Sequence, residues 1–229
     1  MSANNDLMLD VSQAVELKLA FRRNGWNNAQ IKTLSEGDIL AKVLQVITGQ
    51  AEINLIAKPM PIKKWREDNG VIYFSVTSDG TTGAKWITRL IAKGFKIGDC
   101  ANSLLRSVNF KPTSGVTTEI AVLKGIIFTD RERITKKIRQ EATKHKLTKP
   151  NVEVACLIRE MFSSEDIKAM GLSWIVTMHE PIKNSVGDLM LLSAYRDDDG
   201  SWLYTSCGGS GDGWRGNDGF AFEISQVSL

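Results

Sequence analysis

The segment 193–219, SAYRDDDGSWLYTSCGGSGDGWRGNDG, constrains the fold of this chain more than any other part of the sequence. Of its 27 residues, 19 are Gly, Asp, Ser, Tyr or Asn, and none is Lys, Glu, Gln, Met, Pro, Val, Ile or Phe. Such a stretch supplies little hydrophobic core, but the interleaved Trp202, Leu203 and Trp214 argue against disorder. We therefore expect a loop-rich surface in which both tryptophans are largely buried and the surrounding Tyr, Ser and Asp side chains are exposed.

The simplest interpretation of a stretch rich in Gly, Ser and Asp is a flexible loop without a function. A plain loop of this length is uncommon inside a compact domain, however, and is usually functional or disordered. Tyr, Ser, Gly and Asn are also the residues that antibody-like binding surfaces use, because rigid rings and small polar groups adapt to a ligand at low entropic cost. We therefore favour a binding surface.

The order of residues near the C-terminus resembles the end of the C-type-lectin fold of the formylglycine-generating-enzyme type. The resemblance covers about residues 189–227 and more closely matches the variable proteins of diversity-generating retroelements, found in phages and in small-genome bacteria and archaea. The residues that carry it are Leu191, Leu192, Arg196, Gly200, Ser201, Trp202, Trp214, Arg215, Gly219, Phe220, Ala221 and Phe222.

In that system, adenine-directed mutagenesis of a repeat near the end of the gene rewrites chosen codons. The products are mainly Tyr, Asp, Ser, Gly, Cys, Thr and Ala, which is the alphabet of residues 193–219. The resemblance therefore implies a ligand-binding protein, not an enzyme, whose diversified surface spans residues 193–218 on a C-type-lectin-like scaffold. Arg196, Trp202, Trp214 and Arg215 would be unvaried scaffold residues.

The resemblance implies a macromolecular ligand, which we expect to be a protein, with no cofactor and no metal. Tyr195 and Tyr204 would be the energetic anchors, because an immobilised ring buries a large area at little rotamer cost. The acidic side chains would favour a basic partner. The expected contact residues are Ser193, Tyr195, Asp197, Asp198, Ser201, Tyr204, Ser206, Cys207, Gly208, Ser210, Asp212, Gly213, Asn217 and Asp218.

The remaining sequence predicts an α+β chain with two parts. Apolar residues at helical spacing predict three short helices, at 11–23, 29–34 and 39–47, within a helical N-terminal region of residues 1–62. Residues 57–70, with two prolines, a charge run and a closing Asn-Gly, are the expected linker. Residues 70–229 are then the C-type-lectin-like domain.

Within that domain, short apolar runs and capping residues alternate. We expect a helix after SDGTTG with Ile87, Leu90 and Ile91 facing inward, and another capped by Asn151. A further helix, capped by Ser163, should end at Gly171. The expected strands are VIYFSV, TEIAVLKG, LSWIVTM and FAFEISQV.

An oxidoreductase of the formylglycine-generating type is the first alternative, since it shares the fold. Its chemistry needs two thiolates that converge on copper. The C-terminal segment contains only Cys207, while Cys100 and Cys156 lie far upstream. The other groups that could serve in catalysis or metal binding are also unconvincing. His179 is expected to be structural rather than a general base, and the run Asp197–Asp199 lacks the ligand spacing of a calcium loop.

A DNA-binding regulator is the second alternative. Residues 130–150 carry eight Lys or Arg against three Asp or Glu, and Arg22, Arg23 and Lys32 accompany the N-terminal helices. The basic run has Ile134, Ile138 and Ala142 at helical spacing, as in an ordinary amphipathic surface helix, and contains no aromatic side chain for base stacking. We therefore do not expect nucleic-acid binding.

The sequence also bears on location. No apolar run approaches the roughly 20 residues that a membrane-spanning helix needs. The N-terminus lacks the basic and apolar regions of a secretory signal, and three widely spaced cysteines do not suggest a disulfide framework. We therefore expect a cytoplasmic protein without a membrane span.

Overall fold

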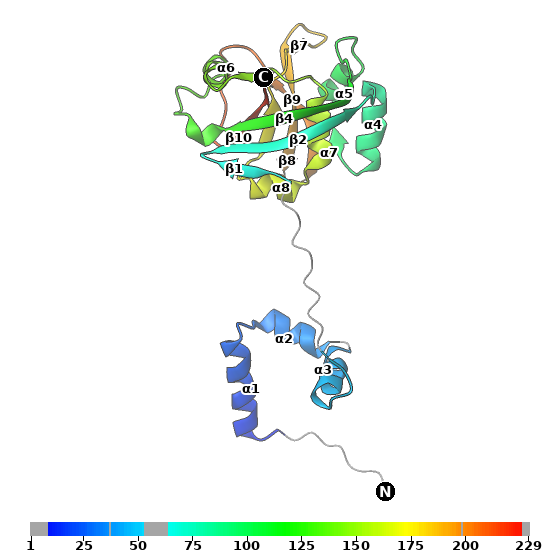
Figure 1. Cartoon of the computed structure of the whole chain (residues 1–229), viewed down its shortest axis with the longest axis vertical. Coiled ribbons are helices and arrows are strands. Elements are labelled where there is room, and N and C mark those ends of the chain that lie inside the picture. Colours follow the sequence, from blue (N-terminus) through cyan, green and yellow to red (C-terminus); the bar gives the residue numbers. More distant parts are fainter. Residues whose placement is uncertain (1–8, 37, 53–63, 198, 226–229) are drawn as a thin grey trace. The chain divides into compact units, whose positions relative to one another are not determined.

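The computed structural model describes residues 9–36, 38–52, 64–197 and 199–225. The chain divides into two compact units, Met1–Pro61 and Ile62–Leu229, which we call the N-terminal unit and the second unit. Helices and a large mixed sheet together make this an α+β protein, as the sequence predicts (Figure 1).

The N-terminal unit contains the three predicted helices, α1 (Val11–Arg23), α2 (Asn28–Ser35) and α3 (Ile39–Ile47). Capping boxes fix the starts of the first two. The side chain of Asp10 accepts the amide of Gln13, and that of Asn27 accepts the amide of Gln30. None of the residues in these helices is buried.

The second unit is built on one sheet, whose strands lie in the order β1-β2-β4-β10-β6-β8-β9-β3, with β5 paired to β10 and β7 to β8. β10 lies inside the sheet, antiparallel to β4 and parallel to β6. The strand bounds are β1 Arg66–Asp68, β2 Val71–Asp79, β3 Lys96–Ile97, β4 Ser114–Lys124, β5 Leu147–Thr148, β6 Trp174–Thr177, β7 Ile182–Lys183, β8 Leu189–Asp197, β9 Gly200–Cys207 and β10 Asp218–Ile224.

Helices cover both faces of this sheet, and two hydrophobic clusters result. The larger cluster joins the first face to α4, α5, α7 and α8, with residues such as Ile72, Ile120 and Leu192 from the sheet. The smaller cluster joins the second face to α6. The helix bounds are α4 Gly83–Ala92, α5 Asp99–Leu105, the 3₁₀ helix η1 Gly125–Ile127, α6 Thr135–Lys144, α7 Val154–Met161 and α8 Ser164–Ala169.

The predicted linker is partly wrong. Residues 57–63 lie outside the described residues, but Arg66–Asp68 form strand β1, which pairs with β2. Asn69 and Gly70 join the two strands with φ of 49° and 76°, the left-handed backbone that a tight hairpin turn requires. The Asn-Gly pair therefore marks a hairpin within the second unit rather than the end of a linker.

Two predicted helix details are also wrong. Ile91 on α4 is 57% exposed, whereas Ile87 and Leu90 are buried as predicted. The helix expected after Asn151 begins only at Val154, because the Asn151 side chain accepts the amide of Glu153 in a turn before the helix. Ser163 caps α8 with a complete capping box, as predicted.

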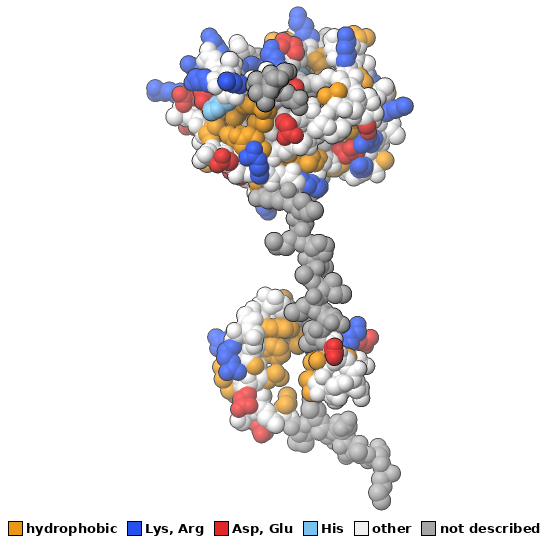
Figure 2. All heavy atoms as spheres, in the orientation of Figure 1, with side chains coloured by type: hydrophobic (Ala, Val, Ile, Leu, Met, Phe, Trp, Pro, Cys, Tyr) orange, Lys and Arg blue, Asp and Glu red, His pale blue; other side chains and the backbone are white. Residues whose placement is uncertain are grey.

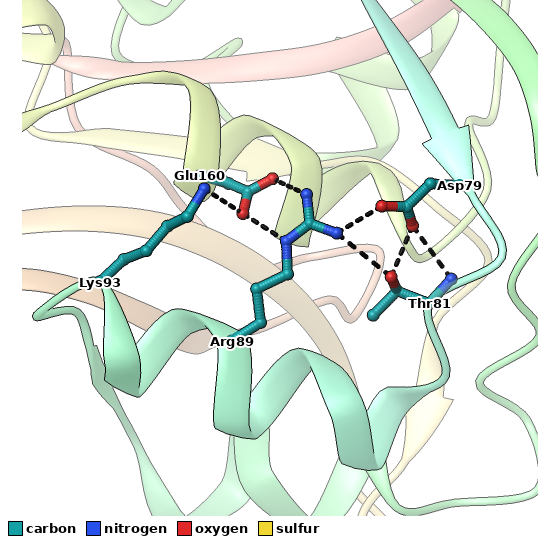
Figure 3. A network of polar contacts seen from close by, with 5 residues as sticks. All are labelled: Asp79, Thr81, Arg89, Lys93 and Glu160. Atoms are coloured by element: carbon teal, nitrogen blue, oxygen red, sulfur yellow. Dashed lines mark hydrogen bonds and ion pairs between the residues drawn. The ribbon is translucent and has the colours of Figure 1, made fainter.

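An ion-pair network connects α4 to α7 (Figure 3). The guanidinium of Arg89 donates to both carboxylate oxygens of Glu160 and also to Asp79, while Lys93 reaches Glu160 at 2.7 Å. Hydrogen bonds from Thr81 and Arg89 lower the pKa of Asp79 to about 2. The network has every charge paired and holds the two helices over the first face of the sheet.

Candidate functional site

Most of the unusual C-terminal segment is not a loop. Its first part forms the hairpin of β8 and β9, in which Ala194 pairs with Leu203 and Tyr195 pairs with Trp202. Alternate residues therefore point to opposite faces, so that Leu203 and Thr205 are buried while Tyr204 between them is 42% exposed. The prediction of a loop-rich surface is wrong for β8 and β9 and holds only for residues 208–217, which we call the 208–217 loop.

Four aromatic side chains lie together on the second face of the sheet. We call Trp174, Tyr195, Trp202 and Tyr204 the aromatic cluster. Trp174 on β6 is directly opposite Tyr195 on β8, and their rings stack with centroids 3.9 Å apart. The Tyr204 ring lies edge-on to Trp174 at 5.8 Å and to Trp202 at 6.4 Å. The cluster is a continuous, partly exposed aromatic surface across three adjacent strands.

Gly98 and Lys96, which lie outside the segment, and Asp197 within it hold this cluster in place. A side chain at Gly98 would lie 2.7 Å from the Tyr204 ring, so the glycine is what allows the ring its position. The ammonium of Lys96 lies 5.0 Å from the centroid of the Trp202 ring, and the indole N–H of Trp202 donates to Asp197 at 3.3 Å. The rings are thus oriented before any ligand arrives.

Trp202 and Trp214 both keep only a minor part of their surface exposed, so the prediction that they are largely buried is confirmed. Trp202 shares a partly exposed face with Tyr204, because strand β9 has only the short β3 on the side away from β8. Trp214 packs edge-on to Phe220 at 5.5 Å and donates from its indole N–H to the Thr135 hydroxyl at 3.0 Å.

The 208–217 loop is attached to the rest of the unit mainly through backbone groups. The first two amides of α6, Thr135 and Lys136, donate to the carbonyls of Asp212 and Ser210 at 3.0 and 2.9 Å. The amide of Trp214 donates to the Arg133 carbonyl at 2.9 Å. No side chain caps α6, so the loop carbonyls satisfy amides that a helix start leaves unpaired.

Three of the fourteen predicted contact residues are buried, which contradicts their expected exposure. Ser193 is enclosed because β8 is an inner strand, with Val176 and Tyr204 directly beside it. Gly208 is covered by Leu191. Asp218 turns back to accept the amide of Arg215 at 2.7 Å, and burial raises the pKa of its carboxyl.

The other predicted contact residues lie at or near the surface of the second unit. Tyr204, Cys207, Ser210, Gly213 and Asn217 are exposed. The structure leaves Asp198 outside the described residues. The half-buried members are Tyr195, Asp197, Ser201, Ser206 and Asp212. Of these, Ser201 lies on the first face, where its hydroxyl is 2.5 Å from that of Ser164 on α8, away from the aromatic cluster.

Sequence reasoning missed Trp174 and Arg159. The sequence predicts Trp174 only as part of a strand, whereas its ring forms the centre of the aromatic cluster. Arg159 is fully buried in α7 and donates to the carbonyls of Tyr195 and Phe162. Burial lowers the pKa of Arg159 to about 10. Only contacts distant in sequence identify either role, so no local signal could have found them.

His179 has both ring nitrogens in hydrogen bonds. Its Nε2 accepts the amide of Leu192 at 3.0 Å, and its Nδ1 donates to the carbonyl of Glu180 at 2.6 Å. Burial lowers the pKa of the imidazole to about 4, so the ring is neutral near pH 7. These bonds support the structural role that the sequence suggests for this histidine.

The three cysteines have different surroundings. Cys207 is exposed, Cys100 is half-buried and Cys156 is buried in α7, where burial raises the pKa of the thiol. Within the described ranges, no three His, Cys, Asp or Glu side chains form a group that could hold a metal ion. None of the described helices has the length and apolar character that crossing a membrane requires.

The basic helix predicted at residues 130–150 is α6, and part of its charge is used internally. Arg139 donates to the carbonyls of Met178 and His179 at 3.0 Å each, and burial lowers the pKa of its guanidinium. Ile138 and Ala142 are buried as predicted, whereas Ile134 is the N-cap residue and half-buried. Lys136, Lys137 and Lys144 remain exposed to solvent.

We predict that this helix does not bind DNA strongly. Labelled duplex and single-stranded DNA should bind more weakly than micromolar at about 200 mM salt, and any binding at about 50 mM should be orders of magnitude tighter, as for purely electrostatic contacts. Fluorescence anisotropy measures both. Micromolar binding that persists at the higher salt, and that is lost in a Lys136→Glu, Lys137→Glu variant, would show that the prediction is wrong.

Comparison with known protein families, with curated proteins and with solved structures finds no match to this chain.

Proposed function

We propose that the chain is a ligand-binding protein with a diversified surface, in the manner of retroelement variable proteins, and that its second unit is a C-type-lectin-like domain. The aromatic cluster is the observation that carries the proposal. Its members are held by stacking, by Gly98 and by Asp197, yet Tyr204 still exposes 42% of its surface. Immobilised rings of this kind bind a ligand without losing further rotamer entropy.

Some of the proposed variable positions belong to this cluster, namely Tyr195 and Tyr204, and others lie close to it along the chain. Ser206 on β9 is next to it on the second face, hydrogen-bonded to Ser193 at 3.0 Å. The 208–217 loop continues from the same strand and is positioned by the carbonyls of Ser210 and Asp212. Because these anchors are backbone groups, side chains in the loop can differ between variants while the loop keeps its position.

The proposed ligand is a macromolecule, and a protein fits the surface best. The cluster extends across three strands rather than lining a deep pocket, and its rings are aromatic, the type that dominates protein interfaces. Asp197, which accepts the indole N–H of Trp202 at the edge of the cluster, favours a basic partner. We propose no cofactor for this binding function. We also propose that the protein is cytoplasmic.

We predict that exposed positions at this surface tolerate diversification. A library should keep the fold in most clones, because exposed substitutions each change the free energy of unfolding by within about 0.5 kcal/mol. Selection against an immobilised basic protein such as lysozyme should enrich particular combinations. The four exposed positions to randomise are Tyr204, Cys207, Ser210 and Asn217.

A matched library tests whether the aromatic cluster matters. Ser75, Thr77, Thr117 and Glu119 are equally exposed strand positions on β2 and β4, away from the cluster. This second library should yield far fewer binders of the same probe. Equal yields, or widespread unfolding in the first library, would contradict the proposed binding surface.

Sequencing the DNA beside the gene tests the retroelement part separately. We expect a near-copy of the codons for residues 193–218 and a reverse-transcriptase gene close by. The two copies should differ at adenines, and the differences should fall in codons such as those of Tyr204, Ser210 and Asn217 rather than in those of Trp202 and Trp214. Flanking DNA without such a repeat would contradict the proposed diversification. It would not bear on the binding surface, which the library experiment tests.

A further inference from the structure

The described residues of the N-terminal unit include many hydrophobic side chains, none of which is buried. No residue of α1, α2 or α3 is buried, and Figure 2 shows hydrophobic side chains open on the surface of this unit. Among the described residues, eleven large hydrophobic side chains are exposed here, against eight in the whole second unit. On α3, these side chains form one stripe at helical spacing: Ile39, Leu40, Val43, Leu44 and Ile47.

Helices of this length need a packing partner. α1, α2 and α3 have 13, 8 and 9 residues, and isolated helices shorter than about 12–15 residues are marginal in water. The capping boxes specify where α1 and α2 begin, but caps alone do not supply the burial that stabilises helices in proteins. A surface that covers the stripe on α3 is therefore required for a stable N-terminal unit.

We propose that a second copy of this chain supplies that surface, so that the N-terminal unit is a self-association module. Residues 1–61 contain six acidic and six basic residues, so two such units meet without net repulsion. In α1, Glu16 precedes Lys18, Arg22 and Arg23, and an antiparallel pair of these helices would place acidic residues near basic ones.

The second unit of the same chain and a membrane surface are less suitable partners for the apolar stripe on α3. Among the residues described in the second unit, the exposed hydrophobic ones lie on separate elements, such as Ile91 on α4 and Val116 on β4, and do not line one helix as in α3. Helices that lie on membranes usually carry a basic polar face, whereas residues 1–61 have no net charge. A copy of the same three helices offers both apolar stripes and complementary charge.

The mass of the full-length chain in solution tests the proposal. Sedimentation velocity and light scattering from about 1 to about 100 μM should give a defined multiple of 25.3 kDa at the higher concentrations, because association follows mass action. The double variant Val43→Glu, Leu44→Glu should sediment at 25.3 kDa throughout. Lys42→Glu changes the net charge by the same amount on the polar side of α3 and should keep the wild-type mass.

Three outcomes would overturn the proposal. A wild-type chain that is monomeric at every concentration is the first. If hydrogen exchange then shows protected amides in α3, the second unit of the same chain covers the stripe. A double variant with the wild-type mass would place self-association elsewhere, and a mass that grows without a fixed stoichiometry would indicate aggregation. The test is independent of the proposed ligand surface.

Discussion

Gly125→Ala should detach the 208–217 loop and lower the free energy of unfolding by about 3 kcal/mol, the upper range for inserting an atom into a packed site. A β-carbon at Gly125 would lie 2.4 Å from the carbonyl oxygen of Arg215 and 2.9 Å from that of Asp218. Both contacts are with backbone, so no side-chain rotation relieves them. Chemical denaturation measures the loss, and hydrogen exchange should show faster exchange at the amides of Thr135 and Trp214.

Gly211→Ala is the matched control, because a β-carbon there has no atom within 4 Å. This variant should change the free energy of unfolding by within about 0.5 kcal/mol and leave exchange at α6 unchanged. Similar losses in the two variants would mean that glycine flexibility in general, and not the close approach at Gly125, determines the position of the loop.

Lowering the pH from 7 to 4 should reduce stability by about 3 kcal/mol through His179 alone, since each unit of pKa difference corresponds to about 1.4 kcal/mol. The pKa of His179 is about 4 in the folded chain, against the usual 6.5. Between these values, the unfolded chain takes up a proton that the folded chain does not. The contribution of His179 to the free energy of unfolding is therefore fully present above pH 6.5 and is lost as the pH drops toward 4.

Comparison of two variants isolates this effect from that of the carboxyl groups that titrate in the same range. His179→Gln should have a lower free energy of unfolding than the wild type at pH 7. The difference between the two free energies should be smaller by about 3 kcal/mol at pH 4. His145→Gln, at an exposed position on the end of α6, should follow the wild-type curve. If the wild type and His179→Gln lose stability in parallel, protonation of His179 is not the cause.

Local patterns in the sequence predict the helices and several strands well. Ser163 forms the cap that the sequence predicts for α8, and the apolar runs at 71–76 and 220–222 lie in β2 and β10 as expected. These features depend on neighbours within four residues along the chain. The α+β class follows from them, but the order of strands in the sheet does not.

The candidate site depends on contacts that a local pattern does not contain. Tyr195 stacks on Trp174, which lies 21 residues earlier, and Tyr204 requires Gly98, more than a hundred residues away. The part of the hairpin within residues 193–207 has few aliphatic residues and therefore favours a loop prediction, because aromatic rings, rather than Val or Ile, cover one of its faces. The burial of Arg159 is likewise not evident from local sequence, since its partners are backbone carbonyls and not acidic side chains.

The anchoring of the 208–217 loop has a consequence for protein engineering. Several groups that set its path, namely Gly125, the Arg133 carbonyl and the amide of Thr135, belong to residues at least seventy positions earlier in the chain. Residues 209–213 could therefore be exchanged as a cassette for other sequences of equal length, with Trp214 retained as the fixed end. Several residues that position the loop therefore lie far upstream in the sequence from the loop residues whose side chains would contact a ligand.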